Sequence, residues 1–302
     1  MRDCVIATVL VLSLSSWLSA EPPGQRSTSG SDEKLNIMVI GAHPDDPEEV
    51  GGTMSRFVAM GNRVRLVAMT NGNAGHFDMG GGPLAQRRYK EAQCAGKVIG
   101  AEYVVIDNDD GELMPTLENR HIVIRLIREF NADIVITHRP NDYHPDHRNT
   151  GLLVRDAAYM VTVPNIVPNA PHLQKNPIFM YTEDNFSKPN EFSPNLVVGI
   201  DDAIEKKIDM YDCHESQVYE WLPYNMGILD QVPGDPSQRR AWLASRWKPR
   251  SARTADGYRA KLIELYGSDK GSKIQYAEAF ELSEYGSRPD LTALKRLFPF
   301  FD

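Results

Sequence analysis

The chain is predicted to form one α/β domain, in which helices cover both faces of a doubly wound, mostly parallel sheet. Short apolar runs of strand length alternate with amphipathic stretches of helix length from residue 35 onward. Several of these runs are continuously apolar, as in strands buried on both faces. The composition is that of a globular protein, with 41% hydrophobic and 25% charged residues among 302.

Each predicted element follows from a local pattern. The segment "LNIMVIGA" is apolar throughout and ends in glycine, and the helix expected over 83–99 has Pro83 near its start and Gly100 after its end. Strands are predicted at 35–42, 63–70, 101–107, 132–138, 177–182 and 195–201, and the other helices at 47–60, 117–131, 146–160 and 201–216. This alternation predicts a Rossmann-like sheet with its strands largely parallel.

The two ends of the chain differ from this core. Residues 1–20 read as a secretory signal peptide with Arg2, an apolar stretch and Ala20, because the apolar run is shorter than the roughly 20 residues of a membrane anchor. A flexible leader follows over 21–34 and the core over 35–230. Residues 231–302 are predicted to form a helical extension packed on the core, with an independent module as the alternative. The protein is therefore expected to be exported, as a secreted or periplasmic protein.

Charge and cysteine content narrow the possible partners. The formal net charge of −8 and the absence of a Lys/Arg run argue against a nucleic-acid-binding surface. Cys94 and Cys213 remain after signal cleavage, and the sequence leaves open whether they pair. Neither lies in a CxxC motif, so neither indicates a thiolate zinc site.

The segment Ala42–Gly52 ("AHPDDPEEVGG") places one histidine and four carboxylates where the first predicted strand ends. Asp46 is the expected N-cap of the next helix, followed by Pro47 and an acidic first turn. His43 and Asp45 lie before this cap and are not explained by it. Because open parallel sheets bind ligands beyond the carboxyl ends of their strands, both are candidate functional residues.

A second polar cluster, "THRPNDYHPDH", follows the fourth predicted strand. It places His144 and His147 three residues apart at the start of a helix. In a doubly wound sheet the first and fourth strands can be neighbours at the point where the strand order reverses. The two loops then supply a histidine, an aspartate and a histidine to one metal ion.

This donor set favours catalytic zinc, which takes three protein ligands and keeps a position for water. Magnesium and calcium prefer oxygen ligands throughout, while other divalent metals that accept imidazole stay possible. Zinc lowers the pKa of bound water to about 7. Asp45 is placed to take a proton from that water, and His144 to stabilise an oxyanion, which indicates metal-assisted hydrolysis of an amide or ester.

At these residues the sequence resembles the PIG-L/LmbE-like family of zinc-dependent N-deacetylases. The family signatures AHPDDxE and HPDH are matched by Ala42–Glu48 and His144–His147. Weaker similarities lie in "MTNGNAG", "RRYKEA", "DNDDGEL" and "YDCHESQ", so that the resemblance extends from Leu35 to about Gln217.

The resemblance implies a role for each residue of the two motifs. His43, Asp46 and His147 would bind zinc. Asp45 would be the general base, and His144 would stabilise the oxyanion.

The resemblance also implies substrate contacts outside the two motifs. Arg88 and Asp110 would bind substrate, with Asp109 as an alternative alignment for the latter. His214 is either a hydrogen-bonded structural histidine or a substrate-binding wall of the site. His76 is expected to be a solvated loop histidine rather than part of a lid, and the aromatics of "YEWLPYN" are either core or a sugar-stacking surface.

The predicted function is removal of an N-acetyl group from an N-acetylated amino sugar or glycoconjugate, with Zn²⁺ as cofactor. The expected partner is a small-molecule or glycan substrate, with no nucleic acid and no stable membrane span after signal cleavage. The alternatives are an amidase that cleaves a larger acyl group and a noncatalytic carbohydrate-binding relative, which would lack a ligand or the base. A nucleotide-binding Rossmann protein would need G-x-G-x-x-G after the first strand, where His-Pro-Asp-Asp stands instead.

Overall fold

The computed structural model describes residues 34–301. The predicted signal peptide (1–20) and the leader as far as residue 33 lie outside the described residues. Within the described part, no helix is both long and apolar enough to cross a membrane.

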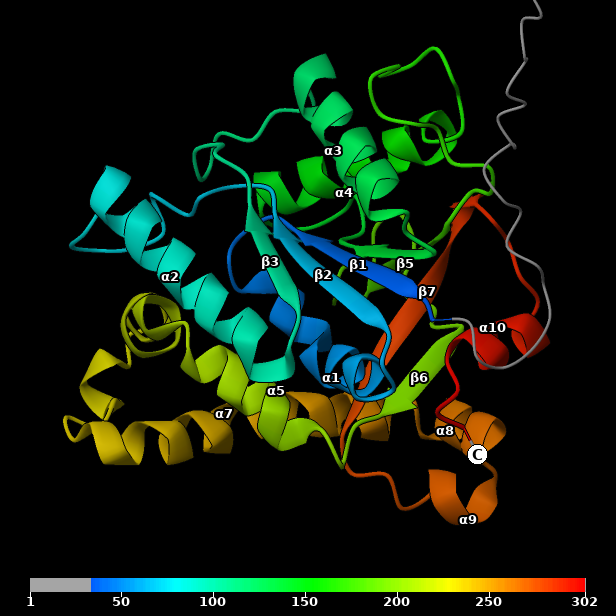
Figure 1. The fold of residues 1–302 in the computed structure, drawn as a ribbon. Helices are drawn as coiled ribbons and strands as arrows, with labels where there is room; N and C mark the ends of the chain where they lie inside the picture. Colours follow the sequence, from blue (N-terminus) through cyan, green and yellow to red (C-terminus); the bar gives the residue numbers. More distant parts are fainter. Residues whose placement is uncertain (1–33, 302) are drawn as a thin grey trace, which may run out of the picture. The chain divides into compact units, whose positions relative to one another are not determined.

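The described residues form one seven-stranded sheet with helices around it (Figure 1). The strands are β1 (Asn36–Gly41), β2 (Arg63–Ala68), β3 (Glu102–Val105), β4 (Ile134–Thr137), β5 (Ile178–Thr182), β6 (Leu196–Gly199) and β7 (Ala277–Gly286). The α-helices are α1 (Gly51–Ala59), α2 (Gly81–Ile99), α3 (Leu117–Phe130), α4 (Pro145–Met160), α5 (Ile204–Asp212), α6 (Leu222–Asn225), α7 (Pro236–Gly257), α8 (Arg259–Tyr266), α9 (Ser268–Gly271) and α10 (Leu291–Leu297). Short 3₁₀ turns form at η1 (Asp46–Val50) and η3 (Leu229–Gln231), and η2 (Ser216–Trp221) is π-helical.

The strand order is β3-β2-β1-β4-β5-β7-β6, and the first five strands in this order are parallel. The chain runs outward from β1 to β3 on one side and from β4 to β5 on the other. The order therefore reverses between β1 and β4, which are neighbours, with Ile37 opposite Ile134. The predicted fold class is confirmed, including the reversal between the first and fourth strands.

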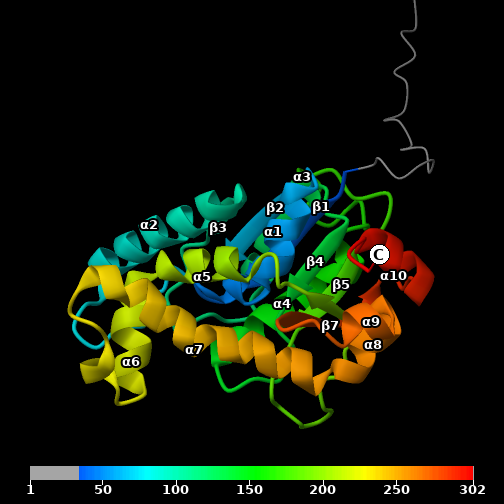
Figure 2. The same ribbon diagram turned by 90° about the horizontal axis from the view of Figure 1, so that it is seen from below.

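Helices cover both faces of the sheet, and β1 shows why. Its side chains alternate between two hydrophobic clusters: Ile37 and Val39 pack with residues of α1, α2 and α5, while Met38 and Ile40 pack with α3 and α4. Figure 1 shows α3 and α4 above the strands and α1, α5 and α7 below them. Figure 2, drawn from below, shows the long helix α7 running across that lower side. Burial on both faces explains the continuous apolar run of this strand.

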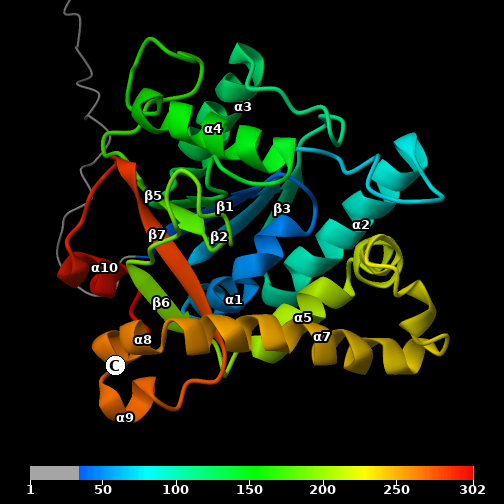
Figure 3. The ribbon, with the colours of Figure 1, turned by 180° about the vertical axis from the view of Figure 1, so that it is seen from behind.

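The C-terminal segment differs from its prediction. The expected helical extension over 231–302 holds for α7 to α10, but it also contains β7, which the prediction misses. β7 is antiparallel to both of its neighbours and lies between β5 and β6 (Figure 3). Its sequence, "AEAFELSEYG", is rich in Glu and Ala, which are depleted in strands, so composition favoured a helix. The segment is thus part of the sheet and not an appendage to it.

A buried charge on β7 ties the sheet to the start of α1. Glu278 is only 3% exposed and accepts hydrogen bonds from the backbone N–H groups of Gly52 (3.0 Å) and Thr53 (2.8 Å). Lys207 of α5 donates to the same carboxylate at 2.9 Å and also to the carbonyl of Glu49. These contacts fix the turn η1, which leads away from the polar loop after β1.

Candidate metal centre and active site

Two loops leave the sheet side by side, one after β1 and one after β4. The loop after β1 folds back on itself, because Asp46 approaches the backbone of Gly41. A Cβ atom at Gly41 would lie 2.6 Å from the Cβ of Asp46, which no side chain tolerates. Glycine at the end of the strand is therefore a condition for bringing Asp46 next to His43.

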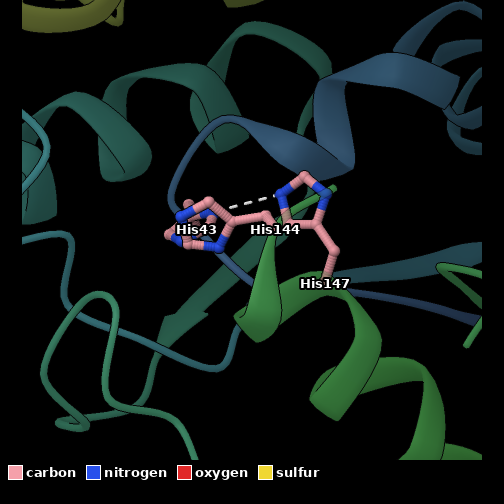
Figure 4. Close-up of side chains that lie close together, drawn as sticks. All are labelled: His43, His144 and His147. Carbon is pink, nitrogen blue, oxygen red and sulfur yellow. Dashed lines mark hydrogen bonds between the residues drawn. The ribbon is translucent and has the colours of Figure 1, made fainter. Parts of the chain in front are cut away.

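The three residues predicted to bind metal, His43, Asp46 and His147, lie close together here, and Figure 4 shows the two histidines beside His144. His147 Nε2 lies 3.2 Å from His43 Nδ1 and 3.5 Å from Asp46 Oδ1, and His43 Nδ1 lies 3.3 Å from Asp46 Oδ2. A tetrahedral ion with bonds of about 2.0–2.1 Å holds its ligand atoms about 3.3 Å apart. The two histidine nitrogens are spaced like ligands of a zinc-sized ion, and Asp46 approaches each of them with a different oxygen.

In both His43 and His147, the ring nitrogen that faces away from the other histidine contacts a carboxylate. His43 Nε2 lies 3.1 Å from Asp110 Oδ1 and 3.3 Å from Asp146 Oδ2, and His147 Nδ1 lies 3.1 Å from Asp142 Oδ1. Metal-bound histidines usually donate their second N–H to such a partner, which fixes the ring and its tautomer. His43 Nδ1 and His147 Nε2 are thereby left to face each other across the candidate site.

The electrostatics of the centre are those of a cation site. Burial opposes charge on His43, but the hydrogen bonds that its ring donates to Asp110, Asp146 and Asp46 outweigh it and raise its pKa well above the usual value. Burial likewise opposes charge on His147, while Asp46 raises its pKa to about 8. The carboxylates therefore create a field that favours positive charge between the rings.

Asp46 does not cap a helix, contrary to the prediction. It lies inside η1, and its Oδ2 accepts the backbone N–H groups of Ala42 (2.9 Å) and His43 (2.7 Å), which precede it. His138 Nε2 also lies 3.2 Å from this oxygen. With Oδ2 engaged, Oδ1 is the oxygen that faces His147. Burial opposes ionisation, but His147 and His138 hold the pKa of Asp46 well below its usual range.

Further donors surround the predicted three. In the described part of the chain, three groups have donor atoms close enough to share an ion. They are His43 with His144 and His147; His43 with Asp110, His144 and Asp146; and Asp46 with His138 and His147. The ring of His138 stacks on that of His147 at 4.2 Å. His43, His144 and His147 each occur in two of these groups, and none of the three groups found among the described residues holds His43, Asp46 and His147 together.

Asp45 lies beside this centre and is held by Arg88. The Arg88 guanidinium donates to Asp45 Oδ1 at 2.6 Å and to the carbonyl of Pro44 at 3.1 Å. Burial raises the pKa of Asp45 above its usual value, although Arg88 opposes this effect. Arg88 was predicted to bind substrate. Its side chain is 2% exposed, and the hydrogen bonds that it makes are to Asp45 and Pro44.

His144 occupies the more open side of the centre, with 26% of its side chain exposed. Its Nδ1 accepts the backbone N–H of Asp146 at 3.2 Å, which makes it the N-cap of α4. Burial lowers its pKa, and His43 and His147 add to this effect. In the neutral ring, the hydrogen then resides on Nε2.

Asp109 and Asp110, the two candidates for a substrate contact, have different surroundings in the structure. Asp110 reaches His43, whereas Asp109 is exposed and bonds to Asn73. Asp110 also lies 3.9 Å from Arg88, on the side opposite the His43 contact. Its observed contacts are therefore with protein groups of the centre.

His214 is completely buried, which contradicts its prediction as a substrate-binding residue. Its Nε2 lies 2.9 Å from Glu48 Oε1, and Glu48 also accepts from the Tyr103 hydroxyl at 3.3 Å. Glu48, expected only to favour a helix start, is likewise fully buried. The buried contact between His214 and Glu48 supports the turn that follows β1. Neither side chain is exposed to a ligand.

The segment after His214 is tied to α2 and to the glycine-rich loop before α2. Cys94 and Cys213 form a disulfide. Ser216 donates its hydroxyl and its backbone N–H to Glu91 at 2.6 and 2.9 Å, and Gln217 donates to the carbonyl of Gly75 at 3.1 Å. The weak "YDCHESQ" similarity thus marks residues that brace the site.

His76 is not the solvated loop residue expected from the sequence. Its side chain is 4% exposed and lies 2.8 Å from Glu220, which Arg87 also holds through two hydrogen bonds. Phe77 stacks between His76 and Tyr224, with ring centroids at 4.6 and 4.4 Å. The stack fastens the glycine-rich loop to α6.

Taken together, these observations describe an α/β protein with a candidate histidine–carboxylate metal centre at the reversal point of its sheet. Residues 38–158 match the family described as PIG-L: GlcNAc-PI de-N-acetylase. This part of the chain is therefore similar to the PIG-L family, and the resemblance stated from its motifs is confirmed. The matched residues include both motifs and end before His214.

Solved structures show the same fold. N,N'-diacetylchitobiose deacetylase from Pyrococcus horikoshii is 24% identical, with a TM-score of 0.63 over 82% of this chain and 84% of that one. The 4-carboxy-2-hydroxymuconate hydratase GalB from Pseudomonas putida is 18% identical (TM-score 0.67; 85% and 99% covered). The A40926 pseudoaglycone deacetylase Dbv21 is 16% identical (TM-score 0.56; 85% and 100% covered). Because a hydratase shares the fold with deacetylases, the reaction must be argued from the site.

Proposed function

We propose that this protein is a metal-dependent N-deacetylase that hydrolyses the acetamide of an N-acetylated amino sugar or glycoconjugate and releases acetate. The observation that carries the proposal is the convergence of His43, Asp46 and His147 within 3.2–3.5 Å of one another, beside the Arg88-held Asp45. The description of the matching family and the names of two similar structures, both deacetylases, support it.

Zinc is the ion proposed for these three ligands, where it would activate water and polarise the acetamide carbonyl. Asp45 takes the proton from the water. Arg88 fixes one carboxylate oxygen of Asp45, so the other is the acceptor. A pKa raised by burial suits a base that works near neutral pH.

His144 stabilises the oxyanion that develops on the carbonyl oxygen. Because its Nδ1 accepts from Asp146, its Nε2–H is the free donor. The proton held by Asp45 then moves to the leaving nitrogen. The second proton of the water passes from the new carboxyl group to the released amine, so that water and the acetamide become acetate and an ammonium group.

Two alternatives stay distinct from this proposal. An amidase for larger acyl groups would use the same residues, and differs only in the acyl group that it accepts. A noncatalytic carbohydrate-binding relative would lack a ligand or the base. All three proposed ligands and the base are present here and in contact, which favours catalysis.

The proposal predicts separate outcomes for the base and for a ligand. Asp45→Asn should keep its metal and lose about 10²–10⁴-fold in kcat, the usual effect of removing a general base. His147→Ala should lose metal affinity as well. The measurements are metal content and acetate release from N-acetylglucosamine, with N-butyrylglucosamine testing the larger acyl group.

Asp269→Asn, an exposed carboxylate on α9, is the matched control and should behave as the unmodified protein. Wild-type turnover by Asp45→Asn would disprove the base assignment. A protein that stays inactive and metal-free after incubation with zinc would contradict the proposed function itself.

We also propose that the protein is exported and works in an oxidising compartment. The apolar segment after Arg2 supports this, as does the disulfide between Cys94 and Cys213, because such bonds persist mainly outside the reducing cytosol. The oxidised state of these cysteines in the exported protein is the measurement that bears on the proposal.

A further inference from the structure

The turn η1, which carries the proposed metal ligand Asp46, has one side that is not buried. It is a 3₁₀ turn, in which side chains three residues apart lie directly above one another. Pro47, Glu48 and Val50 are buried and occupy the other sides of the turn. Asp46 and Glu49 share the remaining side, so Glu49 lies about 6 Å along the turn from the proposed ligand.

The carboxylate of Glu49 is free in the part of the chain that the structure describes. Glu49 is exposed, and its carboxylate takes part in no hydrogen bond or ion pair within residues 34–301. Lys207 donates to the backbone carbonyl of Glu49 but directs its charge to the carboxylate of Glu278, at 2.9 Å. The backbone at Glu49 is therefore held in place, while its side chain is left to bind a ligand.

Two of the proposed metal ligands lie near the Glu49 side chain. Although solvent reaches Glu49, the protein around it desolvates the carboxyl group and raises its pKa to about 7, and the charge of Asp46 adds to this rise. His147 and Lys207 act in the opposite direction. A substrate group next to an acetamide at the candidate centre is therefore within reach of Glu49.

A free carboxylate at this place favours a hydrogen-bond donor on the substrate. In an N-acetylated amino sugar, hydroxyl groups stand on the carbons next to the one that bears the acetamide. We propose that Glu49 is a specificity residue, whose carboxylate accepts a hydrogen bond from one of these neighbouring hydroxyl groups. The inference rests on the proposed deacetylase function and adds a requirement to it: a hydroxyl group beside the acylated nitrogen.

The test changes the protein and the ligand together, with calorimetric binding as the measurement. The protein is the metal-loaded Asp45→Asn variant, in which turnover is blocked, at about pH 8, where the Glu49 carboxyl is mostly ionised. The probes are N-acetylglucosamine and its analogues without the 1-hydroxyl or the 3-hydroxyl. Adding Glu49→Ala should weaken binding of N-acetylglucosamine about 10–100-fold, because a hydrogen bond to a charged acceptor is lost. One of the two analogues should bind equally with and without Glu49→Ala, because it already lacks the hydroxyl that Glu49 binds.

Metal affinity should not change in any of these variants. Glu49→Gln keeps an acceptor oxygen and should weaken binding less than Glu49→Ala. Glu118→Ala is the matched control, an exposed glutamate in the first turn of α3, and should bind every probe as the unmodified Asp45→Asn protein does.

Three results would overturn the role of Glu49. They are unchanged binding of N-acetylglucosamine in Glu49→Ala, an equal loss for all three probes, and a loss of metal affinity, which would make Glu49 a support of the metal centre. Failure of the active, metal-loaded protein to release acetate from any probe would contradict the proposed function instead.

Discussion

Asp110 illustrates how much the role of a single residue depends on what its side chain touches. The family resemblance implies a substrate contact, yet Asp110 Oδ1 lies 3.1 Å from His43 Nε2 and its side chain is 8% exposed. Burial opposes ionisation of Asp110, but the hydrogen bond from His43 lowers its pKa. The geometry is that of a carboxylate which orients a metal-binding imidazole.

The Asp110→Asn substitution separates the two roles. If Asp110 orients His43, the metal dissociation constant should rise about 10–100-fold, as for other outer carboxylates. Competition with a chelating dye measures this directly. Asp109→Asn, the exposed neighbour, is the control and should not change metal affinity. A raised KM at unchanged metal affinity would show that Asp110 acts on substrate.

The sequence predicts the proposed metal ligands but not the carboxylates that contact them. His43, Asp46 and His147 stand in two motifs whose chemistry is readable, and the motifs follow strands that the reversal rule makes neighbours. The pairing of Asp142 with His147, and of Glu48 with His214, depends on which way each side chain points. Glu48 lies inside the first motif, and this position is the sequence signal that could have suggested a buried partner for it.

Among the elements, α2 and η2 work as one unit around the site. α2 carries Arg88, which holds the candidate base, and the disulfide joins this helix to the residue before His214. The hydrogen bonds between Ser216 and Glu91 add a second tie between the two segments. Periodicity predicts the helix α2 but not these ties, which join residues more than a hundred positions apart.

Loss of the disulfide should therefore destabilise the whole protein. The Cys94→Ala/Cys213→Ala double variant should lower the free energy of unfolding by about 2–5 kcal/mol, because the bond restricts a long loop in the unfolded chain. Chemical denaturation measures the change. The unmodified protein treated with a reductant should match the variant, since Cys94 is exposed. Equal stability of the oxidised and reduced protein would contradict this prediction.

At the level of the whole molecule, the sheet depends on a strand from the far end of the chain. β7 separates β5 from β6, and its Glu278 reaches the start of α1 and Lys207. The parallel strands were predictable because apolar runs alternated with helices. β7 was not, because a buried Glu and two Ala residues resemble a helix until their partners are known.

Glu278→Ala should leave Lys207 buried without its partner and two backbone donors unsatisfied. A loss of about 3–5 kcal/mol in unfolding free energy is expected, as for other broken buried ion pairs. Glu284→Ala, an exposed site on the same strand, is the control and should change stability by less than about 0.5 kcal/mol. Equal effects of the two substitutions would show that the Glu278 contacts contribute nothing measurable.

The place of β7 also governs the order in which the chain can fold as it is made. β1 to β4, which carry the candidate metal centre, emerge from the ribosome early and pair with one another. β5 and β6 emerge next, but neither can complete its ladder until residues 277–286 have been synthesised. Until then they keep open strand edges, which readily pair with other chains. A protein cut short before β7 is thus expected to be lost to aggregation although every residue of its proposed catalytic centre is present.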